Sequence, residues 1–283
     1  IPAIKEKVGI PLVADIHFDY KLALAAAEAG VDKIRINPGN IGGLDRVKLV
    51  ADSCRQHGVP IRVGVNSGSL EKDILEKFGS PTPEALVESA LRHVKILEQF
   101  DFDNIVISIK SSDVKTMIES YRLASIRCSY PLHLGVTEAG TERMGIIKSA
   151  VGIGSLLADG IGETIRVSLT GDPLKEVSAA KDILKAVGKG SGVELVSCPT
   201  CGRTRIDLVR AASMIEDAVR DIDKNVKIAV MGCVVNGPGE AMEADIGIAG
   251  GDKCAVIFKK GKVLRKISED EIVPELLKEI EKL

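Results

Sequence analysis

Short apolar runs alternate with amphipathic stretches of helical period over roughly the first two thirds of the chain. The apolar runs cover 11–16, 33–36, 61–65, 104–109, 132–136 and 163–167, and the helical stretches cover 20–29, 44–57, 82–100, 113–125, 141–158 and 174–187. Most of the runs are rich in β-branched residues and largely apolar, as parallel strands covered by helices are. Gly30 and Gly58 follow the first two helical stretches, where helices commonly end. The pattern predicts an α/β fold.

Two α/β architectures fit six such units, an open doubly wound sheet and most of a (β/α)₈ barrel. Polar residues follow nearly every strand, where a barrel places its active site. The chain also begins inside what resembles the end of a helix, at Ile1 to Lys7, so a preceding segment could supply two more strands. We therefore expect a TIM-type barrel over 1–188, with its first two strands missing from this chain.

The pattern changes after the Gly- and Ser-containing stretch 189–192, which indicates a linker. Strands are expected at 193–196, 226–231, 245–248, 255–258 and 263–266, and helices at 206–222 and 269–282. Ser268 is a plausible N-cap for the last helix. This order of elements predicts a separate α+β domain over 189–283.

Composition narrows the class of protein. The 283 residues are 45% apolar and 28% charged with a net charge of −2, so no basic field indicates nucleic acid. No apolar run approaches the roughly 20 residues that a membrane span needs. Six cysteines are too sparse for a disulfide scaffold and no signal peptide is visible, so a reducing compartment, the cytoplasm, is expected.

Three cysteines in the second domain have the spacing of a metal centre. Cys198 and Cys201 form a Cys-Pro-Thr-Cys-Gly knuckle, and Cys233 lies in the Gly- and Pro-rich loop 232–239. A zinc ribbon uses a similar knuckle but needs a second Cys-x-x-Cys, which the sequence lacks. The irregular set favours an iron–sulfur cluster, with zinc or a redox disulfide between Cys198 and Cys201 as alternatives.

The fourth ligand has two candidates. Cys254 precedes an apolar strand and is expected to be a core thiol, as are Cys54 and Cys128 in the first domain. Glu240 ends the loop that holds Cys233, and a carboxylate beside thiolates is a hard, exchangeable ligand. An iron held by Glu240 could therefore accept a substrate oxygen.

Polar side chains at the strand ends of the first domain form a second candidate site. They are Asp15, His17, Arg35, Asn37, Asn40, Arg62, Asn66, Ser67, Lys110, Ser111, Ser112, Thr137, Glu138, Arg166 and Ser168. Cations in otherwise apolar strands need anionic partners, because burying an unpaired charge is costly. Asp15 and Glu138 could neutralise two of them, and pure internal pairing is the alternative. The surplus positive charge favours a bound di- or polyphosphorylated small molecule, since arginine forks suit phosphate.

Glu138 is the only carboxylate at its strand end, so a proton-transfer role is reasonable beside that of a counter-ion. His17 is expected in a loop at the mouth of the barrel. His133 lies within a strand and is expected to be a satisfied core residue. His57 and His93 lie on helices and are expected at the surface.

These motifs together carry a family resemblance. The matching segments are VADIHF (13–18), RINPGNIG (35–42), GVNSGSL (64–70), HLGVTEAG (133–140), SCPTCGR (197–203) and MGCVVNGPGEA (231–241). The chain resembles the 4-hydroxy-3-methylbut-2-enyl diphosphate synthases, iron–sulfur oxidoreductases of the non-mevalonate route of isoprene biosynthesis. Family members begin about 70 residues earlier, with two further barrel strands and another substrate-contacting Arg. The large insertion of plant-type members is absent between the two domains, so a bacterial-type enzyme is expected.

The resemblance implies a reaction and a set of roles. Members open the ring of 2-C-methyl-D-erythritol 2,4-cyclodiphosphate and remove a hydroxyl in a two-electron reduction, with ferredoxin or flavodoxin as electron donor. A 4Fe–4S cluster would be held by Cys198, Cys201, Cys233 and an exchangeable Glu240, and Glu138 would handle a proton. The residues expected to hold the diphosphate are Arg35, Arg62, Lys110 and Arg166 with Asn66 and Ser168, and Asp15, His17 and Asn37 are further candidates beside them. Members work as homodimers in which the cluster domain of one subunit caps the barrel of the other.

Overall fold

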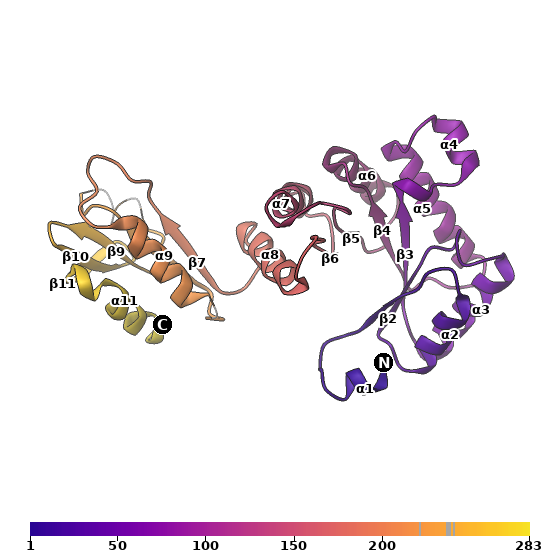
Figure 1. Ribbon diagram of the computed structural model, residues 1–283, viewed down its shortest axis with the longest axis horizontal. Helices are drawn as coiled ribbons and strands as arrows, with labels where there is room; N and C mark the ends of the chain where they lie inside the picture. Colours follow the sequence, from indigo (N-terminus) through magenta and orange to yellow (C-terminus); the bar gives the residue numbers. More distant parts are fainter. Residues whose placement is uncertain (221, 236–238, 240) are drawn as a thin grey trace. The chain divides into compact units, whose positions relative to one another are not determined.

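The computed structural model describes residues 1–220, 222–235, 239 and 241–283. It divides into two compact units, Ile1–Val187 and Gly188–Leu283 (Figure 1). None of the described helices is long and apolar enough to cross a membrane.

The strands of the first unit are parallel and follow one another in sequence order. Four of them form one sheet, namely β1 (Val13–Asp15), β2 (Lys33–Ile36), β3 (Ile61–Asn66) and β4 (Ile105–Lys110). A second, two-stranded sheet holds β5 (His133–Leu134) and β6 (Thr164–Ile165), and a parallel bridge between Ile107 and Leu132 joins it to β4. The predicted series of six strands is therefore confirmed. Within the described residues β1 and β6 are not paired with each other, so these strands do not by themselves close a barrel.

A helix follows each strand, as the alternating pattern predicts. The six are α2 (Tyr20–Glu28), α3 (Leu44–His57), α5 (Pro83–Glu98), α6 (Val114–Arg127), α7 (Glu142–Ala158) and α8 (Pro173–Ala186). Side chains of Asp19, Thr82, Asp113 and Asp172 accept hydrogen bonds from first-turn amides of their helices, which explains where four of them begin. Shorter elements are α1 (Pro2–Lys5), which lies within the helix end expected over 1–7, and the 3₁₀ turn η1 (Ser67–Ser69) and α4 (Lys72–Phe78), neither of which the periodicity predicts.

Alternation along the strands separates the core from the site. In β3, Ile61, Val63 and Val65 are buried in the aliphatic core that the helices cover. Arg62 and Asn66 occupy the alternate positions, and successive side chains of a strand point to opposite faces. The apolar face of the sheet therefore builds the core, while the polar face is free to form a site.

The second unit is a five-stranded mixed sheet in the order β11-β10-β9-β8-β7. Its strands are β7 (Val193–Ser197), β8 (Val226–Met231), β9 (Ile246–Gly251), β10 (Cys254–Lys259) and β11 (Lys262–Ser268), with β7, β8 and β9 parallel and the rest antiparallel. Helices α9 (Leu208–Val219) and α11 (Ile272–Glu281) share one apolar core with strand residues such as Ile228 and Val230. The alternate residues Ala229 and Met231 belong to a second, smaller core.

The last helix begins differently from the expectation. Ser268 forms a capping box with Glu271, as an N-cap should, but the first turn is the 3₁₀ turn η2 (Glu269–Glu271). The α-helix proper starts at Ile272. Tight 3₁₀ turns are common at helix ends, and residue periodicity does not distinguish them from the helix that follows.

Candidate functional site

A row of charged side chains crosses the polar face of the first sheet. Asp15, Arg35 and Arg62 are partners in the parallel register of β1, β2 and β3, so their side chains lie on one face. Nη1 of Arg35 donates to Oδ1 of Asp15 over 2.9 Å. Burial alone would raise the pKa of Asp15, but Arg35, with contributions from Lys110 and His17, holds that pKa below its ordinary value. The carboxylate is thus ionised and neutralises part of the positive charge of this row.

Two glycines let the arginines lie flat against the neighbouring backbone. A Cβ on Gly64 would come within 2.7 Å of Nη2 of Arg35. A Cβ on Gly135, after β5, would come within 2.7 Å of the carbonyl oxygen of Arg166 and 3.2 Å of its Nη2. At Gly135 a larger residue would meet backbone, so glycine is needed there for close approach, whereas at Gly64 a larger residue would displace the guanidinium of Arg35.

Positive charge at this face exceeds the carboxylate charge that pairs with it. Among the described residues, Arg62, Lys110 and Arg166 make no ion pair with a carboxylate, and Nε of both Arg35 and Arg166 is buried without a hydrogen-bond partner. Burial, then the charges of Arg35 and Arg166, lowers the pKa of Lys110 to about 8. Burial also lowers the pKa of Arg62 and Arg166. Such a group of cations is an anion-binding arrangement.

His133 holds one of the arginines from inside the unit. Its Nε2 lies 3.2 Å from Nη1 of Arg62, and its Nδ1 lies 2.8 Å from Oγ1 of Thr164 on β6. Burial, then the charge of Arg62, lowers the pKa of His133 to about 3, so the ring is neutral. Because Arg62 can only donate, Nε2 accepts and Nδ1 carries the proton that reaches Thr164. The expectation of a satisfied core histidine is confirmed.

The remaining predicted residues lie in the loops after the strands. Asn37 and Asn66 each accept a hydrogen bond from the amide two residues on, at Gly39 and Gly68, so both form Asx turns that shape their loops. Nε2 of His17 lies 3.5 Å from Oδ1 of Asp15 and is exposed. Ser168 is partly buried, two residues beyond Arg166.

Glu138 has an unusual backbone. It follows β5, is exposed, and has a φ of +50°, which lies in the left-handed region. Residues other than glycine adopt this region at a cost of the order of 1 kcal/mol, and functional sites are one place where that cost is tolerated. The bend points to a loop whose shape matters for the placement of the Glu138 carboxylate.

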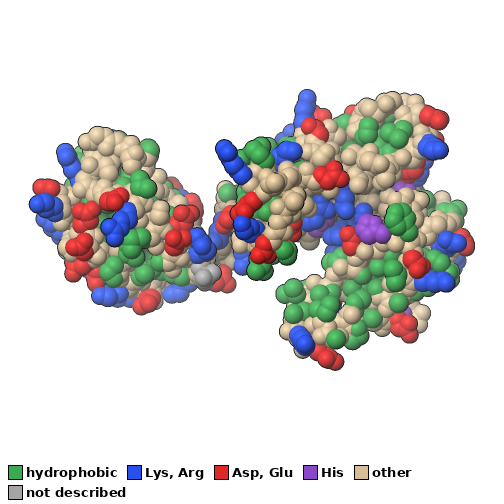
Figure 2. Space-filling view, viewed as in Figure 1, with side chains coloured by type: hydrophobic (Ala, Val, Ile, Leu, Met, Phe, Trp, Pro, Cys, Tyr) green, Lys and Arg blue, Asp and Glu red, His purple; other side chains and the backbone are tan. Residues whose placement is uncertain are grey.

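Lys and Arg side chains gather in a hollow of the first unit in Figure 2, beside a histidine and acidic groups.

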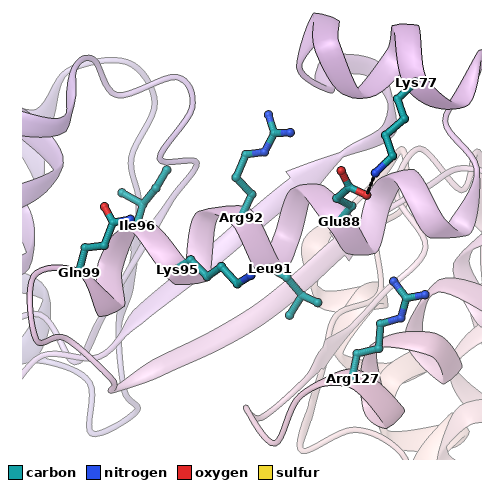
Figure 3. Close-up of a pocket in the computed structure, with 8 residues that line it drawn as sticks. All are labelled: Lys77, Glu88, Leu91, Arg92, Lys95, Ile96, Gln99 and Arg127. Carbon is teal, nitrogen blue, oxygen red and sulfur yellow. Dashed lines mark hydrogen bonds and ion pairs between the residues drawn. The ribbon is translucent and has the colours of Figure 1, made fainter.

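A different groove lies on the outer surface of α5, close to α4 and α6 (Figure 3). It is lined by Lys77, Glu88, Leu91, Arg92, Lys95, Ile96, Gln99 and Arg127. Lys77 pairs with Glu88 and Arg92 pairs with Asp73, so much of its charge is already neutralised. None of the predicted site residues lines this groove.

In the second unit the knuckle lies beside the end of β8. The amide of Gly232 donates to Sγ of Cys198 over 3.2 Å, which places Cys198 next to the segment that carries Cys233. The amide of Cys201 donates to Oγ1 of Thr204 over 3.1 Å. Hydrogen bonds from the backbone and side chain of Arg203 lower the pKa of Cys201, which favours its thiolate.

All six cysteines are free, so Cys198 and Cys201 are not joined as a disulfide. Reduced thiols with N–H donors at their sulfurs are the donor set that iron–sulfur clusters use. Within the described ranges no three Cys, His, Asp or Glu side chains are close enough to hold a single metal ion. Glu240 lies outside the described residues. Burial raises the pKa of Cys54 to about 12 and also raises that of Cys128, in keeping with packing roles.

The prediction for His93 was wrong. This residue is only 3% exposed and pairs with Glu71, with Nε2 3.0 Å from Oε1. A signal for its burial was present, because Leu86, Ala90, His93 and Leu97 follow one another at helical spacing along the buried stripe of α5. Glu71 and Ser89, which complete this cluster, carry no sequence signal of their own.

Comparison with known proteins covers both units. Residues 1–181 match the GcpE TIM-barrel domain, and residues 194–282 match the GcpE protein C-terminal domain. A 4-hydroxy-3-methylbut-2-en-1-yl diphosphate synthase (flavodoxin) of Clostridium perfringens is 62% identical over 99% of this chain and 81% of its own length. Proteins of the same description from Caldanaerobacter subterraneus and Geobacillus kaustophilus are 60% and 58% identical over 100% of this chain, and 80% and 76% of their own lengths.

Proposed function

The chain belongs to the GcpE family of 4-hydroxy-3-methylbut-2-en-1-yl diphosphate synthases, and from this premise we propose how its residues divide the work. The enzyme is an oxidoreductase of the non-mevalonate route that converts 2-C-methyl-D-erythritol 2,4-cyclodiphosphate into 4-hydroxy-3-methylbut-2-enyl diphosphate. In our proposal the first unit, a partial TIM barrel, binds the diphosphate. The second unit carries the redox cofactor.

The assignment of diphosphate binding to the first unit rests on the excess of cations over carboxylates. Arg35, Arg62, Lys110 and Arg166 share one paired carboxylate, Asp15, among the described residues. A diphosphate brings the missing negative charge, and arginine forks can donate to two of its oxygens at once. Side chains of Asn37, Asn66, Ser168 and His17 then complete the rim, as uncharged or titratable partners of the same anion.

The assignment of the redox cofactor to the second unit rests on its cysteines. Cys198, Cys201 and Cys233 with Glu240 would hold a 4Fe–4S cluster, which when bound would pass the two electrons of the reduction, one at a time, from the electron donor. The free thiols, the N–H donor at Cys198 and the lowered pKa of Cys201 support this donor set. A carboxylate would be the most readily exchanged of the four ligands, so Glu240 would be the one to yield its place to a substrate oxygen.

We assign proton transfer to Glu138. The hydroxyl group that leaves in the reduction departs as water and must take up a proton. Glu138 is exposed on the bent loop after β5, and in our proposal its protonated carboxyl group donates that proton from an Oε atom and then takes up another from solvent. The cationic row would also keep the substrate in one orientation.

Partners and location follow from the same scheme. A flavodoxin delivers the electrons, in line with the description of the relatives, and ferredoxin is the alternative. A homodimer in which the second unit of one subunit covers the first unit of its partner would bring cofactor and diphosphate together. Reduced cysteines and an electron donor of this kind suit the cytoplasm.

Anaerobic purification tests the cofactor. We expect about four irons per chain and broad absorption near roughly 400 nm, together with turnover of the cyclic diphosphate when reduced flavodoxin is added. Cys201→Ala should lose the iron and the absorption, whereas the matched control Cys128→Ala should keep both. A colourless chain with one zinc would contradict the cluster.

Glu240→Cys tests the exchangeable ligand. A fourth thiolate should keep the cluster and its absorption, but most turnover should be lost because a thiolate leaves iron less readily than a carboxylate does. Full activity in this variant would show that Glu240 does not act as an exchangeable ligand.

A further inference from the structure

A buried polar cluster lies behind the loop that follows β2. His93 of α5 is 3% exposed, and its Nε2 lies 3.0 Å from Oε1 of Glu71. The hydroxyl of Ser89, one turn earlier on α5, donates to Oε2 of Glu71 over 2.8 Å. Nδ1 of His93 is buried and has no hydrogen-bond partner within the described part of the chain. We call Glu71, Ser89 and His93 the Glu71 cluster.

The imidazole of His93 touches the loop directly. A Cβ built on Gly39 would lie 3.0 Å from Cε1 and 3.4 Å from Nε2 of His93. The loop is closed on itself by two bonds, from the Gly39 amide to Oδ1 of Asn37 over 3.0 Å and from the Asn40 amide to the Asn37 carbonyl over 2.9 Å. A small, internally closed turn therefore rests against the edge of the ring.

The cluster also joins two loops that serve the same site. Glu71 comes shortly after β3, beyond the turn Ser67–Ser69 that Asn66 caps. Gly39 comes shortly after β2, which pairs with β3 in parallel register. His93 thus contacts the loops of two neighbouring strands, and these strands carry Arg35 and Arg62.

The carboxylate of Glu71 holds this arrangement firmly. Burial would raise its pKa, but the neighbouring His93 imidazole first, and the hydrogen bond from Ser89 as well, lower the pKa to about 2. Glu71 therefore stays ionised across the physiological range. The Glu71 side chain is 23% exposed, so it is a partly buried anion, and its contact with His93 favours one orientation of the ring.

We propose that His93 is a positioning residue, whose imidazole, anchored by Glu71, fixes the loop Asn37–Asn40 and thereby sets the affinity of the site for a diphosphate. The inference rests on the proposed function, because it takes the cationic face to be the diphosphate site. It predicts that small changes at the contact between Gly39 and His93 act on substrate binding without touching the substrate. A merely structural role predicts a change in stability alone.

Two substitutions and their combination test the contact. Gly39→Ala presses a methyl group onto the ring, and His93→Ala removes the ring. Each should raise KM for the cyclic diphosphate about tenfold, with kcat changed less than about threefold. In the double variant the new methyl group enters the space that the ring leaves, so its KM should fall well below the product of the two single effects. His93→Gln keeps an N–H for Glu71 and should restore most of the affinity.

The matched control is His57→Ala, an exposed histidine on α3, which should leave KM and kcat unchanged. Turnover by the unaltered chain tests the proposed function, whereas the ratios of KM between the variants test the positioning role of His93. Multiplicative KM effects, or a lower unfolding temperature with unchanged KM in His93→Ala, would overturn the inference and leave the proposed function standing. If the unaltered chain lacks turnover, calorimetric binding of the cyclic diphosphate to the same variants decides the role of His93.

Discussion

At the scale of single residues, the sequence singles out candidate side chains for the chemistry, and the structure adds how they are placed. Arg35, Arg62 and Arg166 are conspicuous because cations in apolar strands need a reason to be there. The orientation of Arg35 across β3 depends on a missing side chain at Gly64, and a strand glycine has several possible meanings. His93 was misplaced because the partner that makes it tolerable in the core, Glu71, is distant in the sequence.

Gly64→Ala tests the placement of Arg35. The new Cβ would fall within 2.7 Å of Nη2, so the guanidinium must leave its position against β3 and its bond with Asp15. We expect KM for the cyclic diphosphate to rise at least about tenfold, which corresponds to about 1.4 kcal/mol of binding free energy. Gly154→Ala on α7 is the control, because its Cβ would make only an ordinary 3.8 Å contact with Val187. Unchanged KM in Gly64→Ala would mean that Arg35 does not bind the substrate from this position.

The lowered pKa of Lys110 predicts that binding of the diphosphate depends on pH. Burial and the neighbouring arginines lower its pKa to about 8, so the amine is charged below pH 8 and becomes neutral as the pH rises through that value. Binding of the diphosphate should therefore weaken above pH 8, by at most about tenfold per pH unit for one lost proton. Arg35, Arg62 and Arg166 remain charged throughout and cannot produce this inflection.

Calorimetric titration of the cyclic diphosphate from pH 6.5 to pH 9.5 measures this effect. Lys110→Arg serves as the control, since a guanidinium keeps its charge over the whole range and should flatten the curve. An inflection near pH 8 that persists in Lys110→Arg would assign the titration to another group.

At the scale of elements, periodicity predicts the order of strands and helices and several of their boundaries. β2 and α3 have the expected bounds, 33–36 and 44–57, because a glycine or a charged residue limits each pattern clearly. α4 was missed because a helix of seven residues gives too short a period to recognise. β5 and β6 shrink to two residues each, since only part of each apolar run takes part in pairing.

Tyr121 explains how β4 and β5 stay together with little direct pairing. This fully buried residue of α6 accepts a hydrogen bond from the Ile109 amide over 2.9 Å and donates one to the His133 carbonyl. Tyr121→Phe leaves both backbone groups without their partner. Because each unsatisfied buried group costs about 1–3 kcal/mol, we expect the free energy of unfolding of this unit to fall by at least about 2 kcal/mol.

Urea unfolding and the exchange rate of the Ile109 amide measure the effect of Tyr121→Phe. Tyr130→Phe removes an exposed hydroxyl that donates to Glu98 over 2.8 Å, and its cost should stay within about 0.5 kcal/mol. Equal losses in the two variants would show that the Tyr121 hydroxyl does not bridge the strands.

At the scale of the whole molecule, the proposed chemistry is divided between two units. The cations and Glu138 belong to Ile1–Val187, while the three proposed cluster ligands Cys198, Cys201 and Cys233 belong to Gly188–Leu283. The sequence predicts this division, because the repeating pattern ends where the cysteine motifs begin. Which subunit's cysteines serve which diphosphate is not written in local patterns, since domain pairing depends on surfaces rather than on periodicity.

Mixing two inactive variants decides that question. Glu138→Gln should disable the proposed proton donor of the first unit, and Cys201→Ala should disable the proposed cofactor site of the second. In a dimer with exchanged caps, the first unit of a Cys201→Ala subunit meets an intact second unit from a Glu138→Gln subunit. Random reassociation of equal amounts should therefore restore about a quarter of the unaltered activity, because half of the dimers are mixed and each has one complete site. The mixture would stay inactive if each chain closed on itself, and a Glu138→Gln, Cys201→Ala double variant mixed with Glu138→Gln should stay inactive in either case.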